Sequence, residues 1–213
     1  STKTSLTGTG GDIKFGRAGN GHIQFETGLT WRSPELELND IGFMREADII
    51  QNYFNITFSS INSFSIFRNA SIGYKHWFNW DFEGNLNYID WDIELNGTFN
   101  NNWSGTFGFF SQPHIYYKSL LQGGPRIFLS DQYGIWWAAN SDNRKKLFVN
   151  YSGWTKTGGL GSYNLLENAF GLTYQPIDRL SASIKPTYTT IQNRLQYNES
   201  QQFQGNLRHK IGS

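Results

Sequence analysis

The fold of this chain is decided by WDIELNGTF, residues 91–99, and by WSGTFGFF, residues 103–110, which follows after a short asparagine-rich turn. In the first segment apolar and polar side chains alternate, with Trp91, Ile93 and Leu95 set against Asp92, Glu94 and Asn96. Successive side chains of a β-strand point to opposite faces, so each segment has one apolar, aromatic face and one hydrophilic face.

The same period of two recurs along the whole chain and never becomes a helical pattern. It predicts strands over residues 12–18, 21–32, 49–59, 69–82, 86–99, 103–111, 129–139, 146–154, 165–175 and 179–190, with a further candidate over 193–198. Pro186 falls on an apolar face inside one of them, which predicts a bulge or an edge strand. Roughly ten-residue segments of this kind are typical of outer-membrane barrels. We therefore expect an all-β fold, an antiparallel transmembrane β-barrel of which about 10–12 strands are visible.

The connections between these strands support that prediction. Short turns such as Gly19-Asn20-Gly21 tend to alternate with long segments at 33–48 and 112–128 and with a glycine-rich stretch at 155–164. Outer-membrane barrels have short periplasmic turns and longer extracellular loops. We expect residues 1–213 to be a single barrel segment, truncated at both ends and belonging to a larger barrel.

The composition is compatible with a membrane barrel and excludes several classes of function. Of the 213 residues 17% are aromatic and 16% are charged, and the net charge of +1 gives no electrostatic signature of nucleic-acid binding. With no cysteine, the chain has no disulfide, thiolate metal site or thiol nucleophile. A mean hydropathy of −0.53 excludes a helical membrane protein but not a barrel, in which only alternate residues meet lipid.

Two loop motifs carry a resemblance to a known family. Residues 33–48, SPELELNDIGFMREAD, resemble the segment SP-x-F-x-x-NDLGF-x-R-x-AD, and residues 122–126, QGGPR, match a weaker second motif. The family is an uncharacterised group of Gram-negative outer-membrane β-barrels, often found downstream of a domain similar to family-nine carbohydrate-binding modules. The resemblance spans roughly residues 10–190, departs from the pattern at Leu36, and does not include the upstream domain. It implies integral location in the outer membrane, and it implies no reaction.

Two groups of residues are candidates for function. Asp90, Asp92 and Glu94 share one strand face, with Asp81 on the neighbouring strand, and together would form an acidic patch in the lumen. Carboxylates can hold calcium, but alternation alone calls for polar residues here, and we expect a hydrated acidic wall without metal or cofactor. The second group consists of loop residues that could form a gate, a constriction or a docking surface: Asn39, Asp40, Gly42, Phe43, Arg45, Gly123, Gly124 and Pro125.

No catalytic constellation emerges from the sequence. The four histidines, His22, His76, His114 and His209, are scattered, and no nucleophile elbow is present. His114, Tyr116 and Tyr117 could stack on sugar rings, although an aromatic girdle at the membrane interface is the simpler interpretation. We therefore expect a protein that is not an enzyme.

The leading hypothesis is an outer-membrane barrel of unknown cargo, acting as a passive or loop-gated channel or as a scaffold for a surface or secretion complex. Its partners would be outer-membrane lipids and a periplasmic or surface protein, with no nucleic acid, while a glycan partner is unsupported by these residues. The alternatives are a soluble β-sandwich that binds glycans and, third, a membrane-embedded hydrolase.

Overall fold

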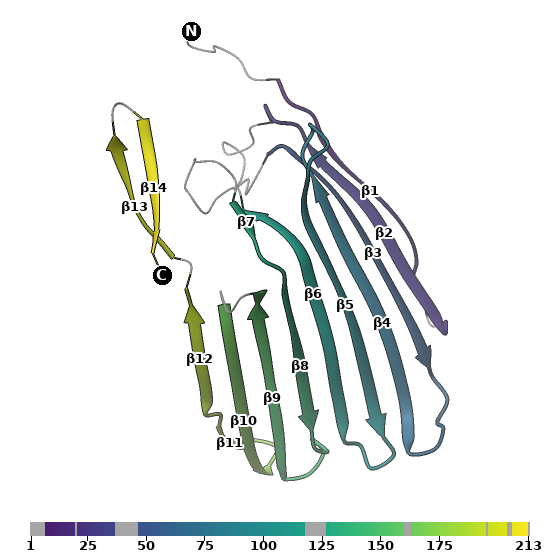
Figure 1. Ribbon diagram of the computed structural model, residues 1–213. Coiled ribbons are helices and arrows are strands. Elements are labelled where there is room, and N and C mark those ends of the chain that lie inside the picture. Colours follow the sequence, from purple (N-terminus) through teal and green to yellow (C-terminus); the bar gives the residue numbers. More distant parts are fainter. Residues whose placement is uncertain are drawn as a thin grey trace.

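The computed structural model describes residues 7–19, 21–36, 47–117, 127–159, 163–194, 196–203 and 206–212, and in these ranges the chain forms strands and turns (Figure 1). Within them no helix has the length and apolar character needed to cross a membrane.

The strands follow one another as an antiparallel meander. They are β1 (Gly10–Arg17), β2 (Ile23–Arg32), β3 (Ile49–Ser60), β4 (Phe67–Trp80), β5 (Leu86–Phe99), β6 (Ser104–Tyr117), β7 (Ile127–Leu129), β8 (Gln132–Asn140), β9 (Leu147–Gly158), β10 (Tyr163–Ile177), β11 (Leu180–Ile184), β12 (Thr187–Asn193), β13 (Gln196–Phe203) and β14 (Asn206–Gly212). The first twelve form one sheet, and β13 pairs with β14 in a separate two-stranded sheet.

Two positions in the large sheet are each filled by a broken strand. Strands β7 and β8 pair in succession with β6, and β11 and β12 pair in succession with β10. The second break lies at Lys185 and Pro186, between Ile184 and Thr187, where the proline interrupts the outermost position of the sheet. The predicted irregularity at Pro186 is therefore confirmed.

The all-β, antiparallel fold predicted from the alternation is confirmed, but the described strands form an open, curved sheet (Figure 1). Strand β1 pairs only with β2 at one edge, and β11 and β12 pair only with β10 at the other. The predicted closure into a barrel is not seen within the described residues.

The strands extend further into the predicted long loops than the sequence indicated. Strand β6 continues through Pro113 to Tyr117 and β7 begins at Ile127, so the predicted loop 112–128 is too long at both ends. Strand β9 likewise continues to Gly158, into the glycine-rich stretch predicted at 155–164. A bulge explains how Pro113 fits, because Asp90 on β5 lies opposite two residues, Gln112 and Pro113. An extra residue on one strand removes the need for the backbone hydrogen bond that proline cannot donate.

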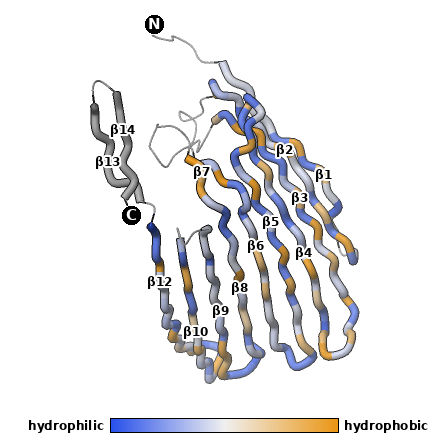
Figure 2. The backbone as a smooth tube through the Cα atoms, in the orientation of Figure 1, coloured by the Kyte–Doolittle hydropathy of each residue, from blue (hydrophilic) through white to orange (hydrophobic). Residues whose placement is uncertain are grey.

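The register places most of the large apolar side chains on one side of the sheet. Ile72 on β4 lies opposite Leu95 on β5, which lies opposite Phe107 on β6 and, through it, Trp137 on β8. We call this side the apolar face and the opposite side the polar face. Figure 2 shows the resulting alternation of hydrophobic and hydrophilic residues along the strands.

The apolar face is uncovered in the described part of the chain. Large side chains such as Phe15, Ile72 and Phe107 are 68%, 46% and 48% exposed, and no large side chain there is fully buried. A single sheet layer has no second apolar layer to pack against, and so it has no conventional core.

The two rims of the sheet differ. One rim, the short-turn rim, carries the connections β1–β2, β3–β4, β5–β6, β8–β9 and β10–β11, and lies at the bottom of Figure 1. The other, the long-loop rim, carries the connections 33–48, 81–85, 118–126 and 159–162. The predicted alternation of short and long connections holds in part, because 81–85 and 159–162 have five and four residues and are no longer than the turns of the other rim.

Candidate functional site: the polar face

Charged and amide side chains from neighbouring strands line up in rows across the polar face. In one row Glu26, Asn55, Lys75 and Asp92 lie side by side on β2, β3, β4 and β5. Directly opposite residues of antiparallel strands have their side chains about 5 Å apart at the Cβ atoms. Acid, amide and base are therefore adjacent along this row.

The predicted acidic patch is assembled in part. Asp90, Asp92 and Glu94 lie on the polar face of β5, as the sequence indicated. Asp81 does not join them, because β4 ends at Trp80 and Asp81 begins the β4–β5 turn. Only 4% exposed, it accepts hydrogen bonds from the Asn85 backbone N at 2.7 Å and from Asn85 Nδ2 at 2.9 and 3.1 Å. Its function is to stabilise the turn.

A hydrogen-bond network along the polar face links the acidic patch on β5 to Lys156 on β9. Tyr88 Oη donates to Asp90 Oδ2 at 2.6 Å, and Gln112 Nε2 donates to the same carboxylate oxygen at 3.0 Å. Lys156 Nζ donates to Gln112 Oε1 at 3.2 Å and lies 5.8 Å from the centroid of the Phe110 ring. Lys156 on β9 reaches Gln112 on β6 because Gly134, opposite it on the intervening strand β8, has no side chain.

Within the described part of the chain, three acceptor oxygens of the polar face have no hydrogen-bond partner. They are Asn55 Oδ1, Asp90 Oδ1 and Asp92 Oδ1, each almost completely shielded by neighbouring atoms. Within the described ranges, however, no three acidic or histidine side chains gather in a geometry that could hold a metal ion.

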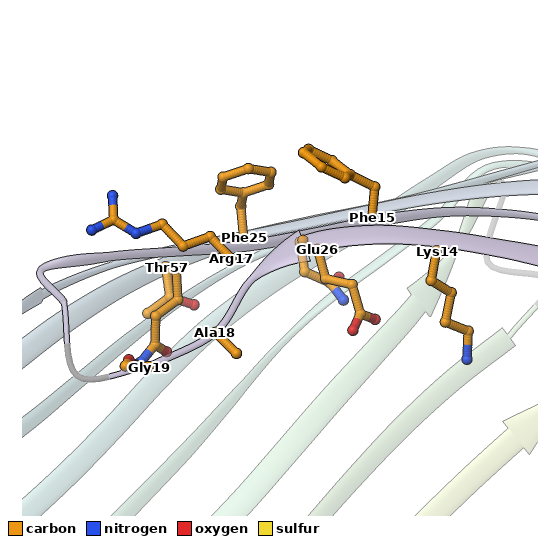
Figure 3. Close-up of a pocket in the computed structure, with 11 residues that line it drawn as sticks. Lys14, Phe15, Arg17, Ala18, Gly19, Phe25, Glu26 and Thr57 are labelled. Carbon is orange, nitrogen blue, oxygen red and sulfur yellow. Dashed lines mark hydrogen bonds between the residues drawn. The ribbon is translucent and has the colours of Figure 1, made fainter.

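The corner of the polar face over β1, β2 and β3 is hollowed. Two adjoining hollows of about 430 and 520 Å³ share Lys14, Glu26 and Asn55 in their walls. Tyr53 Oη donates to Glu26 Oε1 at 2.9 Å, and Lys14 pairs with Asp12 at 3.3 Å. In Figure 3, Lys14 and Glu26 point to one side of the sheet, whereas Phe15, Phe25 and Arg17 point to the other.

Aromatic residues on the polar face were missed by the sequence interpretation, which placed aromatics on the apolar face. Three rings lie against glycines of the adjacent strand at the position that a Cβ atom would take: Tyr53 on Gly28, Trp136 on Gly108 and Phe110 on Gly134. In the sequence, a glycine on the adjacent strand could have indicated these rings, because a ring can lie flat on a strand only where the residue opposite it has no side chain.

A compact polar cluster joins two turns on the short-turn rim. The Arg144 side chain donates to both carboxylate oxygens of Asp142, at 2.9 and 2.7 Å, and Asn102 Nδ2 donates to Asp142 Oδ2 at 3.3 Å. Asp142 is 5% exposed. The hydrogen bonds from Arg144 hold the pKa of this carboxyl far below its usual range, against the opposing effect of burial. Asn102 has a positive φ of 65°, so it also shapes its own turn.

The three histidines whose side chains are described, His22, His76 and His114, bond backbone oxygens or contact aromatic rings. His22 lies 2.8 Å from the Ser59 carbonyl oxygen, and His114 lies 3.1 Å from that of Leu86. His76 is on the apolar face, 4.8 Å from the Phe78 ring. His114 also packs on Tyr116 at 5.1 Å, forming an aromatic cluster near the long-loop rim.

The predicted gate residues lie outside the described part of the chain. This applies to Asn39, Asp40, Gly42, Phe43, Arg45, Gly123, Gly124 and Pro125, and to the side chain of His209.

Comparison with known proteins identifies the family. The model of the family described as Domain of unknown function (DUF5916) matches residues 1–210, and the chain therefore belongs to this family. No curated protein and no solved structure matches the chain.

Proposed function

We propose that the sheet is part of the wall of an integral outer-membrane β-barrel whose interior is a water-filled passage. The apolar face would contact acyl chains and the polar face would line the passage. Strands that pair with the edges at β1 and at β11 and β12 would close the wall. The uncovered apolar face is the observation that carries this proposal.

The exposure of that face argues for lipid as its environment. Across all ten positions of the sheet, large apolar side chains point away from the polar face and stay exposed, from Ile13 at 61% on β1 to Ile184 at 65% on β11. Soluble monomers rarely expose contiguous apolar patches of more than a few hundred Å². In a sandwich a second sheet would pack about 10 Å away on this face, and no such layer exists among the described strands.

The strand lengths fit a membrane span. Strands β4, β5 and β6 each have 14 residues. At about 3.4 Å per residue such a strand is about 48 Å long, and a tilt of about 40° reduces its height to about 37 Å. The hydrocarbon core is about 30 Å thick. Each of these strands is therefore long enough to cross it with a residue or two to spare at either end.

The polar face supports a passage for small hydrophilic solutes. It combines carboxylates, lysines and amides with hollows of about 430 and 520 Å³. Mixed charge of both signs favours selection by size and by a weak field rather than by strong charge. The connections 33–48 and 118–126 remain our candidates for a gate.

Planar-bilayer recording of the purified full-length protein tests the proposal. We expect discrete single-channel conductance that grows with salt concentration, and a change in conductance when Thr57, which lines one hollow, is replaced by arginine. A protein that inserts into bilayers without conductance would indicate a scaffold. A protein that stays monodisperse without detergent and does not insert would contradict the membrane location itself.

A further inference from the structure

The described residues of the two rims carry opposite net charge, although the charge of the whole chain is nearly balanced. The described residues of the short-turn rim, within 17–22, 59–68, 99–104, 140–147 and 176–180, include two acidic side chains, Asp142 and Asp178. The same residues include six basic ones: Arg17, Arg68, Arg144, Lys145, Lys146 and Arg179. On the long-loop rim the described residues include two basic side chains, Arg32 and Arg194, against five carboxylates: Glu35, Asp48, Asp81, Glu83 and Asp131.

Most of the positive charge on the short-turn rim is not neutralised within the sheet. All six basic residues are exposed. Asp142 is matched by Arg144 through its two hydrogen bonds. Arg17, Arg68, Lys145, Lys146 and Arg179 then stand against a single further carboxylate, that of Asp178.

The same rim also carries exposed apolar side chains. Ile61, Phe64 and Ile66 in the β3–β4 connection are 56%, 47% and 59% exposed. Ile177 and Leu180, which flank the β10–β11 turn, are 62% and 57% exposed. Turns that face bulk water do not call for such residues. Basic side chains interleaved with large apolar ones are typical of protein surfaces that lie in the headgroup region of a membrane.

The basic side chains lie next to the apolar face. Arg17 lies opposite Phe25 on β2, and Figure 3 shows its side chain on the same side of the sheet as Phe15 and Phe25. In the β8–β9 turn, Lys146 immediately precedes Leu147, which is 55% exposed on the apolar face. A lipid whose acyl chains contact the apolar face would therefore place its phosphate within reach of these cations.

We infer that the short-turn rim binds anionic phospholipid headgroups, with Arg17, Lys145 and Lys146 among the residues that contact them. The inference rests on the proposed membrane barrel and adds a lipid preference confined to one leaflet. The basic side chains of the rim adjoin the apolar face, which favours a lipid over an acidic soluble protein as the partner. A lipid would contact both the cations and the exposed Ile61 and Ile66, whereas an acidic protein surface would contact the cations alone.

Quenching of tryptophan fluorescence by brominated lipids tests the inference. The protein would be reconstituted in phosphatidylcholine vesicles containing increasing fractions of brominated phosphatidylglycerol or of brominated phosphatidylcholine. Trp103, which is 42% exposed at the short-turn rim, serves as the local probe once its contribution is isolated with the variant Trp103→Phe. Each basic residue near an anionic surface changes the lipid binding constant on the order of fivefold.

We expect stronger quenching of Trp103 by the anionic lipid, and a severalfold loss of that preference in the variant Arg17→Gln/Lys145→Gln/Lys146→Gln. The double variant Lys14→Gln/Lys75→Gln removes positive charge from the polar face and should keep the preference. Equal quenching by both lipids in the native protein, or an undiminished preference in the rim variant, would overturn the inference. Absence of quenching by either brominated lipid would instead contradict the proposed barrel.

Discussion

Replacing Ile93 by arginine distinguishes a lipid-facing surface from a water-facing one. Ile93 lies at the middle of β5 on the apolar face, opposite Tyr74 and Phe109, and its side chain is 38% exposed. On a protein surface in water, a substitution at such a site changes the free energy of unfolding by no more than about 0.5 kcal/mol. At the midplane of a bilayer, arginine on the lipid-facing side of a barrel costs about 2–4 kcal/mol.

Thr57→Arg is the matched control. Thr57 is on the polar face of β3, one residue along from Ile56, which occupies the same row as Ile93. The control adds the same charge at nearly the same depth, but directs it into one of the hollows. Because that side is proposed to be hydrated, the cost of the control should stay below about 0.5 kcal/mol.

The measurement is equilibrium unfolding in urea of protein folded into vesicles, followed by tryptophan fluorescence. With a slope of about 2 kcal/mol per M, Ile93→Arg should lower the midpoint by about 1 to 2 M, and Thr57→Arg by about 0.2 M or less. Equal midpoints for the two variants would refute the assignment of the apolar face to lipid.

Three further predictions follow from the packing and charge of the sheet. Gly108→Ala should destabilise the fold by about 1–3 kcal/mol because the new methyl group overlaps the Trp136 ring. In the same urea assay the control Gly105→Ala should be nearly neutral, because its Cβ would meet only the Ala138 carbonyl oxygen at 3.7 Å. Tyr53→Phe keeps the ring on Gly28 and removes the 2.9 Å hydrogen bond to Glu26, so the free energy of unfolding should fall by about 0.5–1.5 kcal/mol. The control Tyr133→Phe, on the apolar face, should lower the free energy of unfolding by less than half as much. The pKa of Asp142 is held below its ordinary value of 3.8, so its pair with Arg144 stabilises the folded state fully above about pH 4 and progressively less as the pH falls below that. Urea midpoints measured from pH 6 to pH 2 should show this decline in the native protein and in the control Asp178→Asn. The decline should be shallower in Asp142→Asn.

The strands could be predicted from the sequence because their signal is local. Alternation between residues such as Trp91, Asp92 and Ile93 fixes both the strand and its two faces, and the short turns mark where each strand ends. The prediction was wrong where a tertiary feature overrides the local signal. Pro113 indicates the end of a strand, yet a bulge opposite Asp90 lets β6 continue to Tyr117.

The candidate site could be predicted only in part because it depends on pairing between strands. The shared face of Asp90, Asp92 and Glu94 follows from alternation alone. The network from Lys156 through Gln112 to Asp90 depends on the register of four strands and on Gly134 leaving a gap, and neither can be read from one segment. Asp81 was predicted to lie on the strand, but β4 ends one residue before it and Asp81 instead accepts a hydrogen bond from Asn85 in the turn.

Accessibility of spin labels along β5 tests the central claim most directly. A nitroxide placed in turn at each position from Tyr88 to Gly97 would report its exposure to oxygen, which concentrates in lipid, and to a water-soluble nickel chelate. The account predicts a period of two in antiphase, with oxygen favoured at Ile89, Trp91, Ile93 and Leu95 and the chelate favoured at Asp90, Asp92 and Glu94. High chelate accessibility at both sets of positions, or no alternation between them, would contradict it.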